Sequence, residues 1–224
     1  ITNSIINSNS ENDNITISGN MLKSELYGGR HKDTINIAKA TDSLIRGDAN
    51  KDKITINGEL DGTIINGNAD NDFIIINSNS IQSSTVYGGQ GDDRFDISSD
   101  AIYIKGGKGN DDIDLTASKH HTIYGGAGGD SINSNSTKAL FIDAGADEDT
   151  ITLTGVGERS SIHSVDGGAG NDVLNGTTGS ELMDGGTEDN GQDTIDSAGG
   201  DDTIYGLAGN DLIILISQGN TLIH

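Results

Sequence analysis

The stretch of sequence that decides the fold is GGAGNDVLN, from Gly167 to Asn175. Related nine-residue units begin at Gly88, Gly106, Gly125 and Gly206, and weaker copies begin at Ser8, Gly28, Gly47, Gly67 and Ala144. A unit with three additional residues begins at Gly185. Successive units start 18 to 23 residues apart, which is the period of a solenoid in which each repeat forms one coil.

Stacking the units produces two columns of apolar residues. Two places after the Asp of each unit stand Ile15, Ile35, Ile54, Ile74, Phe95, Ile113, Ile132, Ile151, Leu174, Ile195, Ile204 and Ile213. Two places before each unit stand Leu26, Ile45, Ile65, Val86, Ile104, Ile123, Ile142, Val165 and Met183. The neighbours of the first column are mostly polar, so these segments alternate with the period of two that is typical of strands.

The composition of the chain allows only a thin hydrophobic core. The chain has 224 residues, 33 glycines, no proline, no cysteine and a net charge of -22, and 32% of it is hydrophobic. Such a composition is typical of disorder, because little apolar surface is available to offset the entropy lost on folding. Two uninterrupted apolar columns argue against disorder. We therefore expect an all-β parallel β-roll, a β-solenoid with two short strands per coil and a thin core.

The organisation of the roll follows the regularity of the repeats. Residues 1–166 are expected to form an irregular β-roll with turns of the GGxGxD type on one edge. Residues 167–216 are expected to continue it more regularly, since GTTGSELMD from Gly176 and SAGGDDTIY from Ser197 resemble the unit as well. Residues 217–224 are expected to be a C-terminal tail or a link to the rest of a longer protein.

The sixth place of every unit is Asp, and this column points to a metal. Its members are Asp13, Asp33, Asp52, Asp72, Asp93, Asp111, Asp130, Asp149, Asp172, Asp193 and Asp211. Neighbouring carboxylates stacked about 4.8 Å apart repel by about 1 kcal/mol in water and by three to four times that at an effective dielectric near 20. Calcium removes this repulsion, because it takes six to eight oxygen ligands from carboxylates and backbone carbonyls. Eleven turns leave room for about ten ions between them.

These turns resemble the GGxGxDxUx nonapeptides of the RTX (repeats-in-toxin) family, in which U is a large apolar residue. The resemblance covers nearly the whole chain on one edge, and it is most specific from Gly88 to Glu181 and from Ser197 to Asp211. It implies that turn Asp side chains and carbonyls hold calcium between coils, that the protein leaves bacteria by type I secretion, and that folding waits for extracellular calcium. On the other edge only Glu181 and Asp202 fit a second, short calcium ladder.

The expected metal-binding residues follow from this alignment. They are the eleven Asp residues of the column together with Asp202 and the turn glycines Gly88, Gly106, Gly109, Gly125, Gly128, Gly167, Gly170 and Gly206.

Other functional classes are disfavoured. The acidic charge argues against nucleic acid and anionic membrane as partners, and no apolar run is long enough to be a transmembrane segment. The chain has no nucleophile elbow, phosphate loop or dinucleotide fingerprint, so we expect no enzyme activity in it.

The histidines share no ligand spacing and are expected on the surface: His31, His120, His121, His163 and His224. Phe73, Ile75, Leu212 and Ile214 should face outward, covered either by a loop or cap or by another chain.

The leading hypothesis is a calcium-binding, non-catalytic structural segment of a secreted bacterial cell-surface protein, such as a surface layer, filament, motility coat or adhesin. Its partners would be calcium and other copies of itself or other surface proteins. One alternative is the secretion and folding module of a type I secreted enzyme. Another is an ice- or glycan-binding β-roll, against which stand a mixed third-place row in the turns and the lack of an aromatic platform in the sequence.

Overall fold

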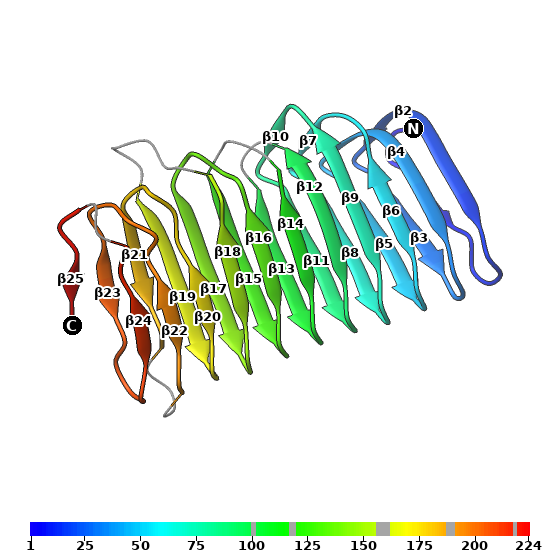
Figure 1. Cartoon of the computed structure of the whole chain (residues 1–224). Helices are drawn as coiled ribbons and strands as arrows, with labels where there is room; N and C mark the ends of the chain where they lie inside the picture. Colours follow the sequence, from blue (N-terminus) through cyan, green and yellow to red (C-terminus); the bar gives the residue numbers. More distant parts are fainter. Residues whose placement is uncertain (100–101, 117–119, 156–161, 187–190, 217–218) are drawn as a thin grey trace.

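The computed structural model describes residues 1–99, 102–116, 120–155, 162–186, 191–216 and 219–224. In this part of the chain the secondary structure consists of strands and turns, and no helix is long and apolar enough to cross a membrane. About eleven coils stack in one direction, with the N-terminus at one end of the solenoid and the C-terminus at the other (Figure 1). The expected all-β parallel β-roll is confirmed.

Two long parallel sheets form the broad faces of the roll (Figure 1). The twelve-stranded sheet contains β1 (Ile5–Asn7), β3 (Glu25–Gly29), β5 (Leu44–Ala49), β8 (Ile64–Ala69), β11 (Thr85–Gln90), β13 (Tyr103–Lys108), β15 (His121–Ala127), β17 (Leu140–Ala146), β19 (His163–Ala169), β21 (Glu181–Asp184), β23 (Thr203–Tyr205) and β25 (Leu222–Ile223). The thirteen-stranded sheet contains β2 (Asn14–Leu22), β4 (Thr34–Thr41), β6 (Lys53–Ile56), β7 (Leu60–Asp61), β9 (Phe73–Ser78), β10 (Ile81–Gln82), β12 (Arg94–Ser99), β14 (Asp112–Leu115), β16 (Ser131–Ser134), β18 (Thr150–Leu153), β20 (Val173–Asn175), β22 (Thr194–Asp196) and β24 (Leu212–Ile214).

The first coils are wider than a flattened two-sheet roll. The ends of β2 and β4 pair with each other and then with the short strands β7 and β10, which adds a third row of parallel strands. Met21, Ala40, Leu60 and Ile81 point from this row into the core and are buried. Two strands in each coil were expected from the sequence, so this third row of strands was not predicted.

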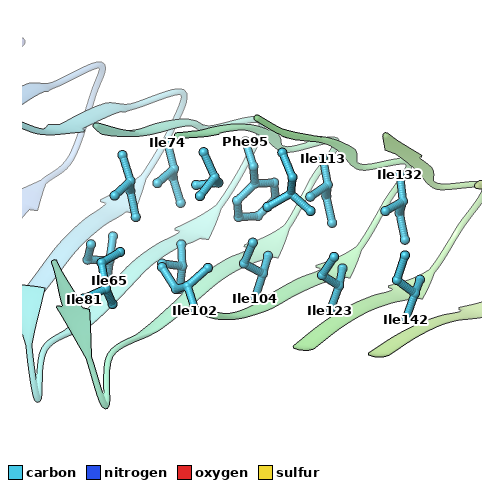
Figure 2. Packing of buried hydrophobic residues seen from close by; sticks show 14 of the residues in the cluster. Ile65, Ile74, Ile81, Phe95, Ile102, Ile104, Ile113, Ile123, Ile132 and Ile142 are labelled. Atoms are coloured by element: carbon cyan, nitrogen blue, oxygen red, sulfur yellow. The ribbon is translucent and has the colours of Figure 1, made fainter. Parts of the chain in front are cut away.

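The core is a thin double layer of aliphatic side chains between the two sheets. Figure 2 shows Ile74, Phe95, Ile113 and Ile132 facing Ile65, Ile104, Ile123 and Ile142. Both predicted columns are in register from coil to coil, and most of their members are fully buried. One assignment was wrong: Ile204 pairs with Met183 in the twelve-stranded sheet, because its unit lies on the opposite edge of the roll.

Outward apolar residues are covered unevenly. The ring of Phe73 lies between two cations of neighbouring coils, with Lys53 Nζ at 5.6 Å and the Arg94 guanidinium carbon at 5.3 Å from its centroid. The long stems of these two side chains cover part of the ring. Leu212 and Ile214 are 57% and 37% exposed near the C-terminal end.

Core packing predicts the cost of truncating a central side chain. Ile104 is fully buried, and its replacement by Ala should destabilise the roll by about 2–5 kcal/mol because it leaves a cavity in a layer only two side chains thick. Thr122→Ala, on the outer surface of the same sheet, should change stability by less than about 0.5 kcal/mol. Urea unfolding in millimolar calcium measures both; equal effects would contradict this description of the core.

Candidate metal-binding turns

The turns of the first edge require left-handed backbone at their second and fourth places. In the turn that begins at Gly88, Gly89 and Gly91 have φ of 124° and 118°. Asp48 and Asn50 reach 81° and 76° in a turn that has no glycine at these places. Glu11, at the fourth place of the first turn, and Leu207, at the second place of the turn that begins at Gly206, also have positive φ, at 112° and 62°, so these turns keep the same shape without glycine there.

The eleven Asp residues form a hydrogen-bonded ladder along this edge. The backbone N–H of each Asp donates to the carboxylate Oδ1 of the Asp one coil further on, over 2.6–3.1 Å. One oxygen of each acceptor carboxylate is therefore occupied by the neighbouring backbone. The ladder places all the predicted carboxylates in one continuous row.

The second carboxylate oxygen faces the inside of the turn. Most of the Asp side chains are buried; Asp33 is fully covered and Asp72 is 2% exposed. The Oδ2 atom is buried without a hydrogen-bond partner in Asp13, Asp33, Asp52, Asp72, Asp93, Asp111, Asp130 and Asp149. A buried carboxylate oxygen without a donor is costly, so these atoms define sites that favour a cation or a proton.

The first residue of each turn is glycine in most coils, and because glycine has no Cβ atom, oxygens of the turn approach it closely. A Cβ atom on Gly28 would lie 2.7 Å from Asp33 Oδ2 and 2.6 Å from the carbonyl oxygen of Gly47 in the next coil. The same two kinds of oxygen surround the Cβ position of Gly67, Gly88, Gly106, Gly125 and Gly167. Each such turn thus gathers a carboxylate and a carbonyl oxygen around a position that only glycine leaves open. We call this position the turn cradle.

Two turns have a side chain at this place. Ser8 replaces the first glycine of the first turn, and its hydroxyl donates to the Gly28 carbonyl. Ala144 replaces the first glycine of another turn and is fully buried. The Ser8 hydroxyl therefore satisfies the carbonyl of the following turn without an ion, and the turn at Ala144 carries a methyl group where its neighbours have glycine.

Burial dominates the electrostatics of the ladder. It raises the pKa of Asp52 and Asp93 to about 7, that of Asp72, Asp111 and Asp149 to about 8, and that of Asp130 to about 6. In each case the hydrogen bond from the preceding Asp lowers the pKa and so opposes this effect. Without a counter-ion, the folded roll therefore holds Asp72, Asp111 and Asp149 as neutral acids near pH 7, because their pKa values lie above that pH.

Comparison with known proteins agrees with this geometry. The RTX calcium-binding nonapeptide repeat matches in four copies, at residues 83–98, 122–136, 164–190 and 187–215. These segments are RTX repeats. No curated protein and no solved structure matches the chain. The RTX turn that begins at Gly106 lies outside the matched segments, yet its cradle and its Asp ladder are the same as in the matched turns.

Calcium is the ion that RTX repeats bind. In this chain the carboxylate Oδ2 and the carbonyl of the following first glycine fit it, because both are hard oxygen ligands and the carboxylate carries charge. Among the described residues no group of three or more His, Cys, Asp or Glu side chains is placed to hold a metal. An ion in an RTX turn would therefore rely on backbone carbonyls for many of its oxygens.

The opposite edge of the RTX roll begins with a ladder of hydroxyl groups that sequence reasoning missed. Ser24 and Ser43 accept backbone N–H bonds from Ser4 and Ser24 in the preceding coils, and the Ser84 hydroxyl accepts that of Thr63, over 3.1–3.2 Å. Each hydroxyl also donates to the carbonyl two residues before it. The signal was present in the sequence as a Ser or Thr two places before each of the first four residues of the Leu26 column, namely Leu26, Ile45, Ile65 and Val86.

Along the same edge, the residues that follow these hydroxyl residues in successive coils are first apolar or His and finally acidic. Ile102, His121, Leu140 and His163 follow the hydroxyl ladder and are all at most 5% exposed. The expectation that His121 and His163 lie on the surface was wrong, because the register points both rings into the roll. Burial lowers the pKa of His163. The neutral form of such a ring suits a position between apolar side chains.

Glu181 and Asp202 end this column as a two-coil version of the first-edge ladder. The Glu181 backbone N–H donates to Asp202 Oδ1 over 3.1 Å, and Asp202 Oδ2 is buried without a partner. Glu181 instead turns back to its own loop, where the Thr177 hydroxyl donates to its Oε1 over 2.6 Å. Burial raises the pKa of Glu181 to about 7 and also raises that of Asp202. These two acids lie at the positions where the sequence predicts a short second ladder.

The raised pKa values predict how pH acts on the calcium-free chain. Since the folded acids hold protons that the unfolded chain has released above about pH 4, stability is greatest at low pH and is lost as pH rises through 6–8. In excess chelator we expect more β-sheet signal by circular dichroism at pH 5 than at pH 8. More β-sheet at pH 8 than at pH 5 in chelator would contradict the assignment of buried neutral acids.

The turn cradle predicts opposite effects for two matched substitutions. Gly106→Ala places a methyl group against Asp111 Oδ2 and the Gly125 carbonyl, so it should remove about one calcium ion and cost about 1–3 kcal/mol. Ala144→Gly opens the equivalent position and should keep or raise the number of ions. Isothermal titration calorimetry gives the stoichiometry. Unchanged calcium binding in Gly106→Ala would show that the ion does not use the cradle.

Proposed function

We propose that this chain is a calcium-folded, non-catalytic structural segment of a secreted bacterial cell-surface protein, such as a surface layer, filament, motility coat or adhesin. The observation that carries the proposal is the buried row of turn carboxylates with unpartnered oxygens, because such a row is stable as ionised groups only with cations between the coils. Calcium would then act as a switch that leaves the chain unfolded before export and rigid after it.

Calcium supply supports an extracellular setting. Extracellular calcium modules typically work at about 0.1–1 mM, well above the range in which intracellular sensors respond. If many calcium ions bind along one edge of the folded roll, their binding free energy contributes to its stability. The stability of the whole roll then depends on the calcium concentration. RTX repeats that are exported by type I secretion would meet this concentration only outside the cell.

The division of the chain supports a scaffold role. In this proposal residues 1–166 form a part whose second edge is closed by hydroxyl and apolar side chains, and residues 167–216 form a part with carboxylates on both edges. The inward side chains of the described coils are used for the core and the ladders. This use of residues supports a structural segment with no catalytic role, whose outer surfaces carry contacts with other copies or other surface proteins.

Removal of one ladder charge tests the proposal. Asp111→Asn keeps an acceptor for the Asp93 backbone N–H but loses the negative charge, so it should raise the calcium concentration at the folding midpoint several-fold. Asp114→Asn, on the outer surface of β14, is the matched control and should leave the midpoint unchanged. Circular dichroism during a calcium titration reads the midpoint; a wild-type chain equally folded in excess chelator at pH 8 would refute the proposal.

A further inference from the structure

The outer surface of the twelve-stranded sheet carries a row of aromatic rings that the sequence does not reveal. Tyr103 and Tyr124 have ring centroids 5.4 Å apart, and Tyr124 and Phe141 have centroids 5.8 Å apart. The three rings come from β13, β15 and β17, which are neighbours in the sheet. The sequence analysis found no aromatic platform, because these rings lie 17 to 21 residues apart in the chain and meet only through the register of the coils.

One outward column of this sheet alternates rings with cations. In strand order it runs through Tyr27, Arg46, Asn66, Tyr87, Lys105 and Tyr124. Together with Tyr103 and Phe141 these residues form what we call the aromatic face. Lys105 lies between Tyr87 and Tyr124, and the Arg46 guanidinium carbon is 5.8 Å from the Tyr27 ring centroid. The aromatic face thus combines flat apolar surfaces with positive charge.

The two cations of the aromatic face have no carboxylate partner among the described residues. The ion pairs in that part of the chain join Lys39 to Glu59, and Arg94 to Asp112 and Asp114. Arg46 Nε is buried and has no hydrogen-bond partner, and Lys105 is exposed. On a chain of net charge -22, two cations that stand among tyrosines and form no ion pair in the described part of the chain mark a surface complementary to an anion. Glu25, which accepts a hydrogen bond from the Tyr27 hydroxyl over 2.6 Å, ends this surface at β3.

The shape and charge of this surface favour a sugar chain. Rings that repeat along the roll at a coil spacing of about 4.8 Å offer stacking surfaces to a long, thin ligand parallel to the axis. Arg46 and Lys105 are three coils apart, which suits a ligand with well-separated charges. A nucleic acid carries one charge per nucleotide and would be repelled by the remaining carboxylates. Further along the same column Asp143, Asp166 and Asp184 follow Tyr124, so the anionic groups of a ligand are limited to the coils up to β15 and Phe141 forms the apolar end of the surface.

We propose that the aromatic face binds an acidic polysaccharide laid along the roll. The tyrosine rings and Phe141 stack on the apolar C–H faces of the sugars, and Arg46 and Lys105 pair with carboxylate or sulfate groups. Thr122 and Asn66, which point outward from the same sheet, lie within this surface and supply hydrogen-bonding groups to sugar hydroxyls. The inference concerns a surface distant from the calcium turns and stands apart from the proposed structural role.

The test measures binding of defined probes to the whole chain in millimolar calcium by isothermal titration calorimetry. Hyaluronan oligosaccharides, which carry one carboxylate per disaccharide, should bind, whereas uncharged chitohexaose and a single-stranded oligonucleotide should bind at least about tenfold more weakly, since the first lacks anionic groups and the second carries a charge on every nucleotide. Arg46→Gln, Lys105→Gln and Tyr124→Ala should each weaken binding about three- to tenfold. Lys53→Gln, a cation on the other sheet, is the matched control and should leave binding unchanged.

Several outcomes would overturn the proposal. They are the absence of binding by hyaluronan oligosaccharides, equal binding of chitohexaose, tighter binding of the oligonucleotide, and an equal effect of Lys53→Gln and Lys105→Gln. Sedimentation that shows self-association abolished by Tyr124→Ala, with no change in oligosaccharide binding, would assign the surface to another copy of the chain instead. The calcium midpoint of every variant, read by circular dichroism, separates these results from a failure of calcium-dependent folding.

Discussion

The structure depends on how a column of buried carboxylates is stabilised. The parallel stacking that builds the core also brings Asp residues of successive coils to one edge, where each is one coil spacing from the next. From Asp33 onward their Oδ1 atoms accept backbone N–H groups, but the Oδ2 atoms from Asp13 to Asp149 are buried without a donor. This edge therefore favours protons or cations, and its turns bring carboxylate and carbonyl oxygens, which are calcium ligands, close together.

On the opposite edge the backbone N–H groups also need acceptors, and in the first coils uncharged side chains supply them. There the backbone N–H of one coil is accepted by a Ser or Thr hydroxyl, which can also donate to a carbonyl, so no atom is left with an excess of negative charge. Further along, Ile102 and Leu140 fill the position with apolar groups, and only Glu181 and Asp202 return to carboxylates. Buried carboxylates are thus confined to one edge in the first coils and occur on both edges near the C-terminus.

Most of the fold could be predicted from the sequence because the turns repeat with little variation. Residues such as Ile113 and Ile123, the left-handed places of the turns and the row of Asp side chains all follow from counting within a unit. The remaining features depend on how strands of neighbouring coils align, and this alignment is set by connecting segments that differ in length and sequence. The buried His121, the third strand row at Met21 and the contact of Tyr103 with Tyr124 could not be derived, since each joins residues whose relative positions are set by loops. The filled cradle at Ser8 was visible only once the glycine position was seen to face a carboxylate.

The most direct test of the account is a crystal structure in calcium with anomalous scattering data, which locates the ions independently of their effect on folding. The account predicts anomalous peaks inside the first-edge turns next to the Oδ2 atoms of residues such as Asp72, Asp93 and Asp111. It also predicts no peak in the cradle of Ser8, where a hydroxyl already contacts the Gly28 carbonyl. Folded coils with no ion beside these carboxylates, or ions bound only on the outer faces of the sheets, would contradict it.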